Sequence, residues 1–273
     1  MEHVPSEPEV VSRLRVLVTG ASGYVGGRLV PQLLVGAGAG GVDVRCVART
    51  PAKLEPAPWR SVVEVLQGDI GGDLTAAMTG VDIAVYLVHS IGQGRNWAAR
   101  ERRDAENFAR AASDAGVRRI VYLGGLGRDS DALSVHLKSR HEVGRLLAST
   151  GVDVVEIRAG VVIGSGSASF EMLRYLVEVL PVMVTPRWVA TRCQPIAIAD
   201  VVAPLVDAVL RDGDLAGIYE VGGPDVVTYA EMMTLYARAA GLVPRRLIPV
   251  PSHSGALVPL GRPRHPGPGF AGA

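Results

Sequence analysis

Short runs of aliphatic and β-branched residues alternate along the chain with longer segments in which apolar residues recur every three or four positions. The runs predict strands at Arg15–Thr19, Val42–Ala48, Val62–Leu66, Ile83–Val88, Arg119–Leu123 and Val152–Arg158. The segments between them predict helices at Tyr24–Val35, Leu74–Met78, Trp97–Ala115 and Leu133–Ser149. Six strands separated by helices predict an α/β fold with a doubly wound parallel sheet of the Rossmann type.

The alternation loosens after residue 164, where small substrate-side insertions are expected. Helices are predicted at Phe170–Leu180, Ala199–Arg211 and Tyr229–Ala240, with a short strand at Ile218–Val221. We expect a single dinucleotide-binding domain over residues 13–250. Residues 1–12 are predicted to be a flexible segment, and they are not expected to be a secretory signal because they carry three glutamates and no apolar run. Residues 251–273 hold five prolines and five glycines, which predicts a disordered tail.

A glycine-rich loop, Thr19–Gly26, lies between the first predicted strand and the first helix. Gly20 suits a tight turn, Gly23 a close approach to a pyrophosphate, and Gly26 close packing of helix on strand. The helix N-terminus offers free N–H groups to phosphate oxygens. A tight turn without a ligand is the alternative, but the strand before and the helix after favour dinucleotide binding. The predicted binding residues of this loop are Gly20, Ser22, Gly23, Tyr24, Val25 and Gly26.

The end of the second strand bears on the choice of nucleotide. An NAD site usually places Asp or Glu there to accept from the ribose 2′-hydroxyl, whereas this strand is followed by Arg49. A guanidinium can pair with a 2′-phosphate through its forked donors, with Arg45 or Lys53 as possible helpers. A solvated surface arginine is the alternative interpretation. The sequence therefore favours NADP over NAD.

Two further segments end predicted strands at the carboxyl edge, where ligands bind in such sheets. Asp69 and Ile70 follow the third strand, where an acid can accept from the adenine amino group; a turn or N-cap aspartate is the alternative. Val88 and His89 end the fourth strand, and His89 is either a functional donor or a solvated, capping histidine. We include all four residues among the expected cofactor contacts.

Composition narrows the class of partner. Lys and Arg number 28 against 27 Asp and Glu, so charge gives no reason to expect nucleic acid or an anionic membrane. The sequence has no stretch of 18 apolar residues, so it predicts no membrane span. Two cysteines are too few for a disulfide framework or a cysteine-rich metal site, and we expect no metal. A cytoplasmic protein acting on a small molecule is the default expectation.

The ordered motifs resemble those of the short-chain dehydrogenase/reductase superfamily in its extended and atypical branches. The resemblance runs from about Leu14 to Pro249 and is carried by TGASGYVG, VARTPAKL, GDI, AGVRRIVYLGGLG, IRAGVVIG, QPIAIADVV and YEVGGPDVVTYAEMM. It is nearest to the NAD(P)H-binding group that includes the NADPH-binding accessory subunit of respiratory complex I and its bacterial relatives. Those bacterial relatives often continue into a further C-terminal domain, where this chain has its Pro/Gly-rich tail.

The catalytic half of that superfamily departs from its usual pattern in this chain. Active members use a Ser and a Tyr-x-x-x-Lys pair, in which Tyr gives the proton and Lys lowers the pKa of the Tyr. Lys53 and Lys138 are the only lysines, and neither follows a tyrosine by four residues. The positional substitute is His136-x-x-x-Arg140, while Gly124 or Gly125 stands at the Ser position. His136 and Arg140 are therefore the predicted catalytic residues.

Two functions remain open from the sequence. In the favoured one, the protein is an NADP-dependent oxidoreductase that reduces a carbonyl or an activated double bond, with His136 as proton donor. In the other, NADPH is bound without turnover by a redox-sensing or assembly subunit. The helices at 97–115 and 133–149 resemble a pair that often mediates dimers in the superfamily, so a homo-oligomer is an open expectation; these faces could equally just cover the sheet.

Overall fold

A seven-stranded sheet forms the centre of the computed structural model, which describes residues 13–37, 41–89, 96–127 and 133–250. The strand order is β11-β6-β5-β4-β1-β2-β3, and all neighbours pair in parallel. The strands are β1 (Leu14–Thr19), β2 (Val42–Ala48), β3 (Glu64–Gln67), β4 (Ile83–Tyr86), β5 (Arg119–Gly125), β6 (Asp153–Ala159) and β11 (Gly217–Val221). The predicted doubly wound parallel sheet is confirmed.

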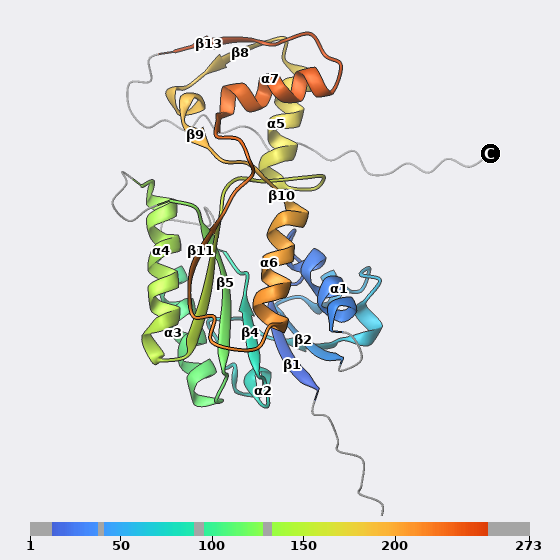
Figure 1. Ribbon diagram of the computed structural model, residues 1–273, viewed down its shortest axis with the longest axis vertical. Helices are drawn as coiled ribbons and strands as arrows, with labels where there is room; N and C mark the ends of the chain where they lie inside the picture. Colours follow the sequence, from blue (N-terminus) through green and yellow to red (C-terminus); the bar gives the residue numbers. More distant parts are fainter. Residues whose placement is uncertain (1–12, 38–40, 90–95, 128–132, 251–273) are drawn as a thin grey trace, which may run out of the picture.

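Helices cover both faces of the sheet (Figure 1). They are α1 (Gly26–Gly36), α2 (Thr75–Met78), α3 (Trp97–Asp114), α4 (Val135–Leu147) and α6 (Ile198–Leu210). Apolar residues of α1 and α6 share one buried cluster with the sheet, while those of α2, α3 and α4 share the other. The cores on the two faces explain why β4 is apolar at every position, since both of its faces are buried.

Most predicted bounds differ from the observed ones by one or two residues. The third strand begins at Glu64 rather than at Val62, because Arg60–Val62 forms a turn of 3-10 helix. Other 3-10 turns lie at Pro51–Leu54, Ala148–Thr150 and Arg187–Ala190. The proline at position 31 lies inside α1, which continues to Gly36. The predicted flexible segment 1–12 and the tail 251–273 lie outside the described residues.

A smaller lobe stands over the carboxyl edge of the sheet (Figure 1). It contains α5 (Ala168–Val179) and α7 (Tyr229–Ala239), which pack on each other through a third buried cluster that includes Met183 and Met233. Its short strands are β7 (Val162–Ile163), β8 (Val182–Thr185), β9 (Arg192–Cys193), β10 (Ile196–Ala197), β12 (Val227–Thr228) and β13 (Arg246–Pro249). They pair as β7 with β10, β9 with β12 and β8 with β13. The sequence predicted the helices of this lobe and missed its strands.

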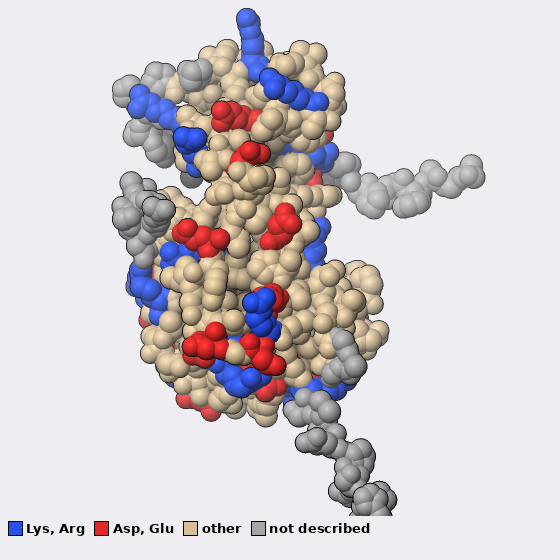
Figure 2. Space-filling view, viewed as in Figure 1, with Lys and Arg blue, Asp and Glu red and all other residues tan. Residues whose placement is uncertain are grey.

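The surface shows the same division. Figure 2 shows an indentation between the lobe and the sheet-bearing body, with acidic and basic side chains interspersed over this face. None of the described helices is long and apolar enough to cross a membrane. The carboxyl edge of β1, β4 and β5, beneath the lobe, is therefore the place where the predicted site residues must be sought.

Candidate nucleotide site

The glycine-rich loop makes a tight turn between β1 and α1. Gly20 has a φ of +71°, in the left-handed region that favours glycine, and its carbonyl accepts a hydrogen bond from the Gly23 N–H at 2.8 Å. A Cβ at Gly26 would lie 2.3 Å from the Gly20 carbonyl oxygen, so no larger residue fits there. Gly20 thus makes the tight turn, and Gly26 allows the start of α1 to lie close to it. Thr19 fixes the end of β1, because its buried hydroxyl donates to the Val85 carbonyl.

The N-terminus of α1 is open to an anion. No side chain caps the helix, and Val25 occupies the N-cap position. The N-terminus of a helix favours an anion because its first N–H groups have no partner within the helix, although in α1 the N–H groups of Gly27 and Arg28 donate to the Gly23 and Val25 carbonyls at 3.0 Å. Ser22 and Gly23 are exposed on the same turn. A glycine cradle next to an uncapped helix start fits the phosphates of a dinucleotide.

Tyr24 was predicted as a cofactor contact of the loop, and in the structure its side chain packs against other parts of the protein. Its hydroxyl is buried without a hydrogen-bond partner in the described structure, and a Cβ at Gly164 would lie 2.5 Å from it. The Arg28 guanidinium lies 4.0 Å from the centre of the Tyr24 ring and donates to the Ser165 carbonyl at 2.8 Å. Tyr24 and Arg28 thus join the glycine loop to the segment 164–166, which leads into the lobe.

Arg49 is exposed just after the carboxyl end of β2, and Lys53 is exposed one turn further on. Arg45 was a possible helper for a 2′-phosphate, and that prediction is wrong. Its side chain is buried and donates to Glu64 Oε2 at 2.7 Å and to the carbonyl of Ala77 at 2.8 Å. Because the Arg45 guanidinium is held against α2, Arg49 and Lys53 are the cations that remain at this strand end.

The adenine-side candidates lie beside the start of α3. Asp69 is exposed and forms an ion pair with Arg100 at 3.1 Å, whereas Ile70 is buried in the core against α3. The Asn107 amide donates to the Ile70 carbonyl at 2.7 Å. This contact fixes the loop after β3, so Asp69 stays at the carboxyl edge.

His89 follows β4 and meets Arg140 of α4. The Arg140 guanidinium lies against the His89 imidazole, and the Arg140 Nε is buried without a partner in the described structure. Burial, and then the charge of Arg140, hold the pKa of His89 well below its usual value, so the ring is neutral near pH 7. Val88, next to it, is half-buried against the core. His89, an expected cofactor contact, and Arg140, a predicted catalytic residue, are thus in contact.

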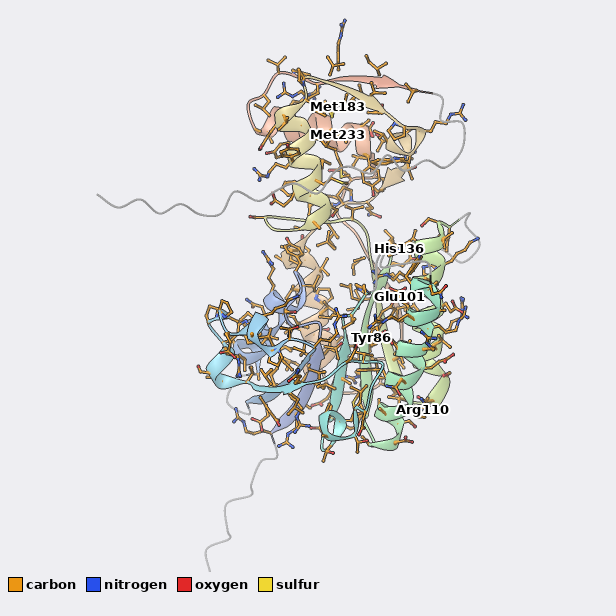
Figure 3. The ribbon with its side chains drawn as sticks, turned by 180° about the vertical axis from the view of Figure 1, so that it is seen from behind. Tyr86, Glu101, Arg110, His136, Met183 and Met233 are labelled. Carbon is orange, nitrogen blue, oxygen red and sulfur yellow. The ribbon has the colours of Figure 1, made fainter. Side chains whose placement is uncertain are left out.

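His136 lies in the first turn of α4, beneath the lobe (Figure 3). Its ring centre is 6.2 Å from that of Trp97, the first residue of α3. Burial lowers the pKa of His136, Arg140 lowers it further, and Glu101 opposes both. Ser134 caps α4 by accepting from the Leu137 N–H at 3.3 Å, which sets where this helix begins.

Two side chains crowd the position of the usual catalytic serine. A Cβ at Gly125 would lie 2.5 Å from Leu137 Cδ2, and one at Gly124 would lie 2.9 Å from Glu156 Oε1. Lys138 is exposed and lies on a different face of α4 from the buried Arg140. A serine at either position would therefore require the end of the Leu137 or the Glu156 side chain to move.

Three polar residues in this region are not among the predicted site residues. Glu101 and Asp104 of α3 are buried, with 4% and 7% exposure. Each stands four residues before a core residue, Ala105 or Phe108, and this spacing could have shown that they share the buried face. Ser139 of α4 is buried as well and donates to Glu101 Oε2 at 2.7 Å.

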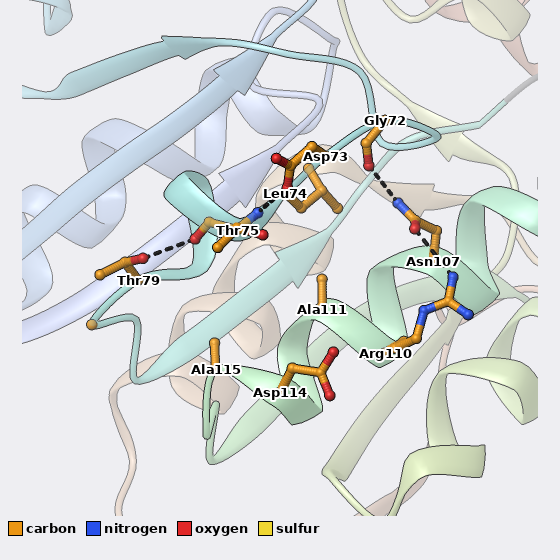
Figure 4. Close-up of a pocket in the computed structure, with 11 residues that line it drawn as sticks. Gly72, Asp73, Leu74, Thr75, Thr79, Asn107, Arg110, Ala111, Asp114 and Ala115 are labelled. Atoms are coloured by element: carbon orange, nitrogen blue, oxygen red, sulfur yellow. Dashed lines mark hydrogen bonds between the residues drawn. The ribbon is translucent and has the colours of Figure 1, made fainter.

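A cavity of about 430 Å³ lies elsewhere, between α2 and the second half of α3 (Figure 4). Its walls include Asp73, Thr79, Asn107, Arg110 and Asp114. The cavity reaches the residues that precede β4 and β5, so it lies at the amino edge of the sheet. Ligands of such folds bind at the carboxyl edge, and the cavity of Figure 4 is separate from the nucleotide site.

The parallel sheet, the glycine turn and the open helix start define a Rossmann-type dinucleotide-binding protein. Residues 20–168 match the model of the NAD(P)H-binding family. The chain belongs to this NAD(P)H-binding family, in agreement with the resemblance to the superfamily found in the sequence.

Relatives and a solved structure agree with this assignment. The chain is 31% identical over 236 residues to a (4-alkanoyl-5-oxo-2,5-dihydrofuran-3-yl)methyl phosphate reductase of Streptomyces griseus, covering 83% of this chain and 74% of that protein. It is 24% identical to the mitochondrial NADH dehydrogenase (ubiquinone) 1 alpha subcomplex subunit 9 of Arabidopsis thaliana, covering 81% and 57%. A triphenylmethane reductase of Citrobacter sp., complexed with NADP(H), shares the fold with a TM-score of 0.70 at 21% identity, covering 87% and 80%.

Proposed function

We propose that the protein is an NADPH-dependent reductase of a carbonyl or an activated double bond, with His136 as proton donor. The observation that carries the proposal is the juxtaposition of an intact glycine cradle with a half-buried histidine at the same sheet edge. The Streptomyces relative supports the double-bond alternative, because the substrate in its name is a dihydrofuranone whose ring double bond is conjugated to two carbonyls.

The choice of NADP rests on Arg49 and Lys53 at the end of β2. Both are exposed there, and no acid stands at this strand end to accept from a 2′-hydroxyl. A charge-assisted hydrogen bond contributes about 1.5–3 kcal/mol, so loss of one guanidinium lowers affinity for a 2′-phosphate about tenfold or more.

Titration calorimetry tests this choice with full-length protein. NADPH is expected to bind more tightly than NADH, and Arg49→Ala to narrow the difference by weakening NADPH alone. Arg238→Ala removes an exposed arginine of the lobe and is the matched control. Equal affinities for the two nucleotides in the wild type would refute the NADP assignment.

The chemistry divides between nucleotide and protein. A nicotinamide nucleotide held by the glycine turn of residues 20–26 would supply a hydride to the carbonyl carbon or to the β-carbon of the double bond. His136 gives a proton to the oxygen or to the α-carbon, and its imidazolium becomes neutral imidazole. Arg140 stands one turn along α4, where it orients His89 and places a positive charge beside the reacting group.

Turnover tests the enzyme directly. We expect the protein to oxidise NADPH in the presence of an acyl-substituted dihydrofuranone or a carbonyl panel, as followed by nicotinamide absorbance. His136→Ala is expected to lower the rate by about 10²–10⁴, while Lys138→Ala, on the exposed side of α4, leaves it unchanged. An unaltered rate in His136→Ala removes that residue from the mechanism.

A second function is favoured by the glycines that stand at the usual serine position and by the absence of a Tyr-x-x-x-Lys pair. In this alternative the protein binds NADPH without turnover, as a redox-sensing or assembly subunit. The Arabidopsis relative, named as a subunit of NADH dehydrogenase, supports it. Tight NADPH binding without oxidation against any member of the panel would decide for this function.

A further inference from the structure

Glu101 is a buried carboxylate that the proposed chemistry does not yet use. It lies in the second turn of α3 with 4% exposure, while the adjacent Arg102 and Arg103 are exposed. Moving a carboxylate out of water without a partner is strongly unfavourable, so buried charges are paired or hydrogen-bonded. The position of Glu101 therefore has to be explained by what it faces.

Glu101 faces the helix that carries the candidate catalytic residues. α3 packs against α4, and the Ser139 hydroxyl donates to Glu101 Oε2 at 2.7 Å. Ser139 is itself 5% exposed, and Arg140, the next residue, is 6% exposed. Figure 3 shows Glu101 between His136 above it and Tyr86 of β4 below. The carboxylate is thus enclosed between α3, α4 and the sheet.

The groups around His136 come from three elements. Arg140 lowers the pKa of His136 from its own helix and Glu101 raises it from α3, while His136 itself lowers the pKa of His89 at the end of β4. The Trp97 ring covers a further side. Among the groups that act on His136 in the described structure, Glu101 is the carboxylate, and its effect on the pKa of His136 opposes that of Arg140.

We propose that Glu101 is a positioning residue for proton delivery: its carboxylate, fixed by Ser139, offsets the charge of Arg140 and allows His136 to carry the proton that it gives to the product. The inference rests on the proposed function, in which His136 is the donor. Glu101 itself touches neither substrate nor nucleotide in this role and acts through α4.

The expected effect has a definite sign. Burial and Arg140 both lower the pKa of His136, and Glu101 raises it. Replacing the carboxylate by a neutral amide removes the opposing influence, so the pKa of His136 falls further. A fall of about one pH unit makes the protonated fraction about tenfold smaller wherever the ring is mostly neutral.

An NMR titration of the His136 imidazole in the full-length protein tests the inference without any substrate. The signal is assigned by its loss in His136→Gln. Glu101→Gln is expected to lower the pKa of His136 by about one unit, and Glu101→Asp, which keeps the charge, to restore most of it. Glu106→Gln, at an exposed position of the same helix, is the control and is expected to leave the pKa unchanged.

Ser139→Ala provides a second variant if Glu101→Gln fails to fold, since it keeps the carboxylate and removes only the bond that fixes it. A smaller fall in the pKa of His136 is expected there. An unchanged pKa in folded Glu101→Gln, or in folded Ser139→Ala where the first variant does not fold, would overturn the inference and leave the His136→Ala test of the proposed function unaffected.

The rate profile provides the second readout. A general acid must be protonated, so kcat/KM falls as pH rises past the pKa of His136. Glu101→Gln is expected to move that limb to lower pH and to reduce kcat/KM about tenfold at pH 7, with rescue by Glu101→Asp. If Glu101→Gln shifts the pKa of His136 in the NMR titration but leaves the pH dependence of kcat/KM unchanged, His136 does not deliver the proton. The role proposed for Glu101 is then refuted as well.

Discussion

The ion pair between Glu156 and Arg158 allows a prediction about what holds α4 in place. The two residues stand two apart on β6, so their side chains share one face of the sheet. Arg158 Nε lies 2.7 Å from Glu156 Oε1, and the side chains are only 7% and 5% exposed. The carboxylate occupies space that glycine leaves on two sides, since a Cβ at Gly144 would lie 2.3 Å from Glu156 Oε2 and one at Gly124 would lie 2.9 Å from Oε1.

Arg158→Met is the informative perturbation, because it leaves Glu156 charged, buried and without its partner. Breaking a pair buried to this extent costs about 3–5 kcal/mol. Removing both charges with Glu156→Gln and Arg158→Met together keeps the shape between the two glycines and is expected to cost at least about 2 kcal/mol less than the single variant. The single variant Arg158→Met is therefore expected to be less stable than the double variant.

Urea unfolding followed by circular dichroism measures these free energies by linear extrapolation. The control is Arg174→Met, which removes the solvent-accessible pairs with Glu171 at 2.7 Å and with Glu178 at 3.3 Å; each such pair contributes less than about 1 kcal/mol. The reasoning is refuted if Arg158→Met costs no more than this control, or if the double variant is as unstable as the single one.

Three further predictions follow from the site. Gly26→Ala should weaken NADPH binding at least about tenfold in calorimetry and lower stability by about 1–3 kcal/mol, because its Cβ would strike the Gly20 carbonyl; unaltered binding would contradict the close packing. The depressed pKa of His89 means that the folded state holds fewer protons than the unfolded state below about pH 6.5, so the free energy of unfolding should fall as pH falls through that value. His89→Asn should flatten that dependence in urea unfolding at several pH values, and an equal slope in both proteins would count against it. Burial raises the pKa of the Cys46 thiol to about 12, so alkylation of the native protein should spare it until urea is added; rapid modification without urea would show that it is exposed.

The sequence predicted the sheet because its signals are local. A run such as Ile83–Val88 and the glycines of residues 20–26 each indicate their own structure, and six of the seven sheet strands and their helices lie close to where the pattern places them. The seventh, β11, was recognised as a strand but not assigned to the sheet, because it joins β6 from about 60 residues further along the chain.

The pairing of β8 with β13 could not be predicted for the same reason. These strands are four residues each and separated by 60 residues, so neither carries a period long enough to identify its partner. The site shows a similar limit. Its glycine loop is a contiguous motif, whereas the cluster of Glu101, Ser139, Arg140 and His89 forms only when α3, α4 and β4 are brought together.

The contact of Tyr24 and Arg28 with residues 164–166 has a consequence for the order in which ligands meet the protein. The glycine turn, which would bind the phosphates, is connected through Tyr24 and Arg28 to the segment that enters the lobe. A change in the mobility of the turn therefore affects that segment. A nucleotide that immobilises the turn also removes conformational freedom from the neighbouring wall of the lobe. A molecule arriving second then finds that wall already ordered and loses less entropy on binding, which favours sequential over random addition.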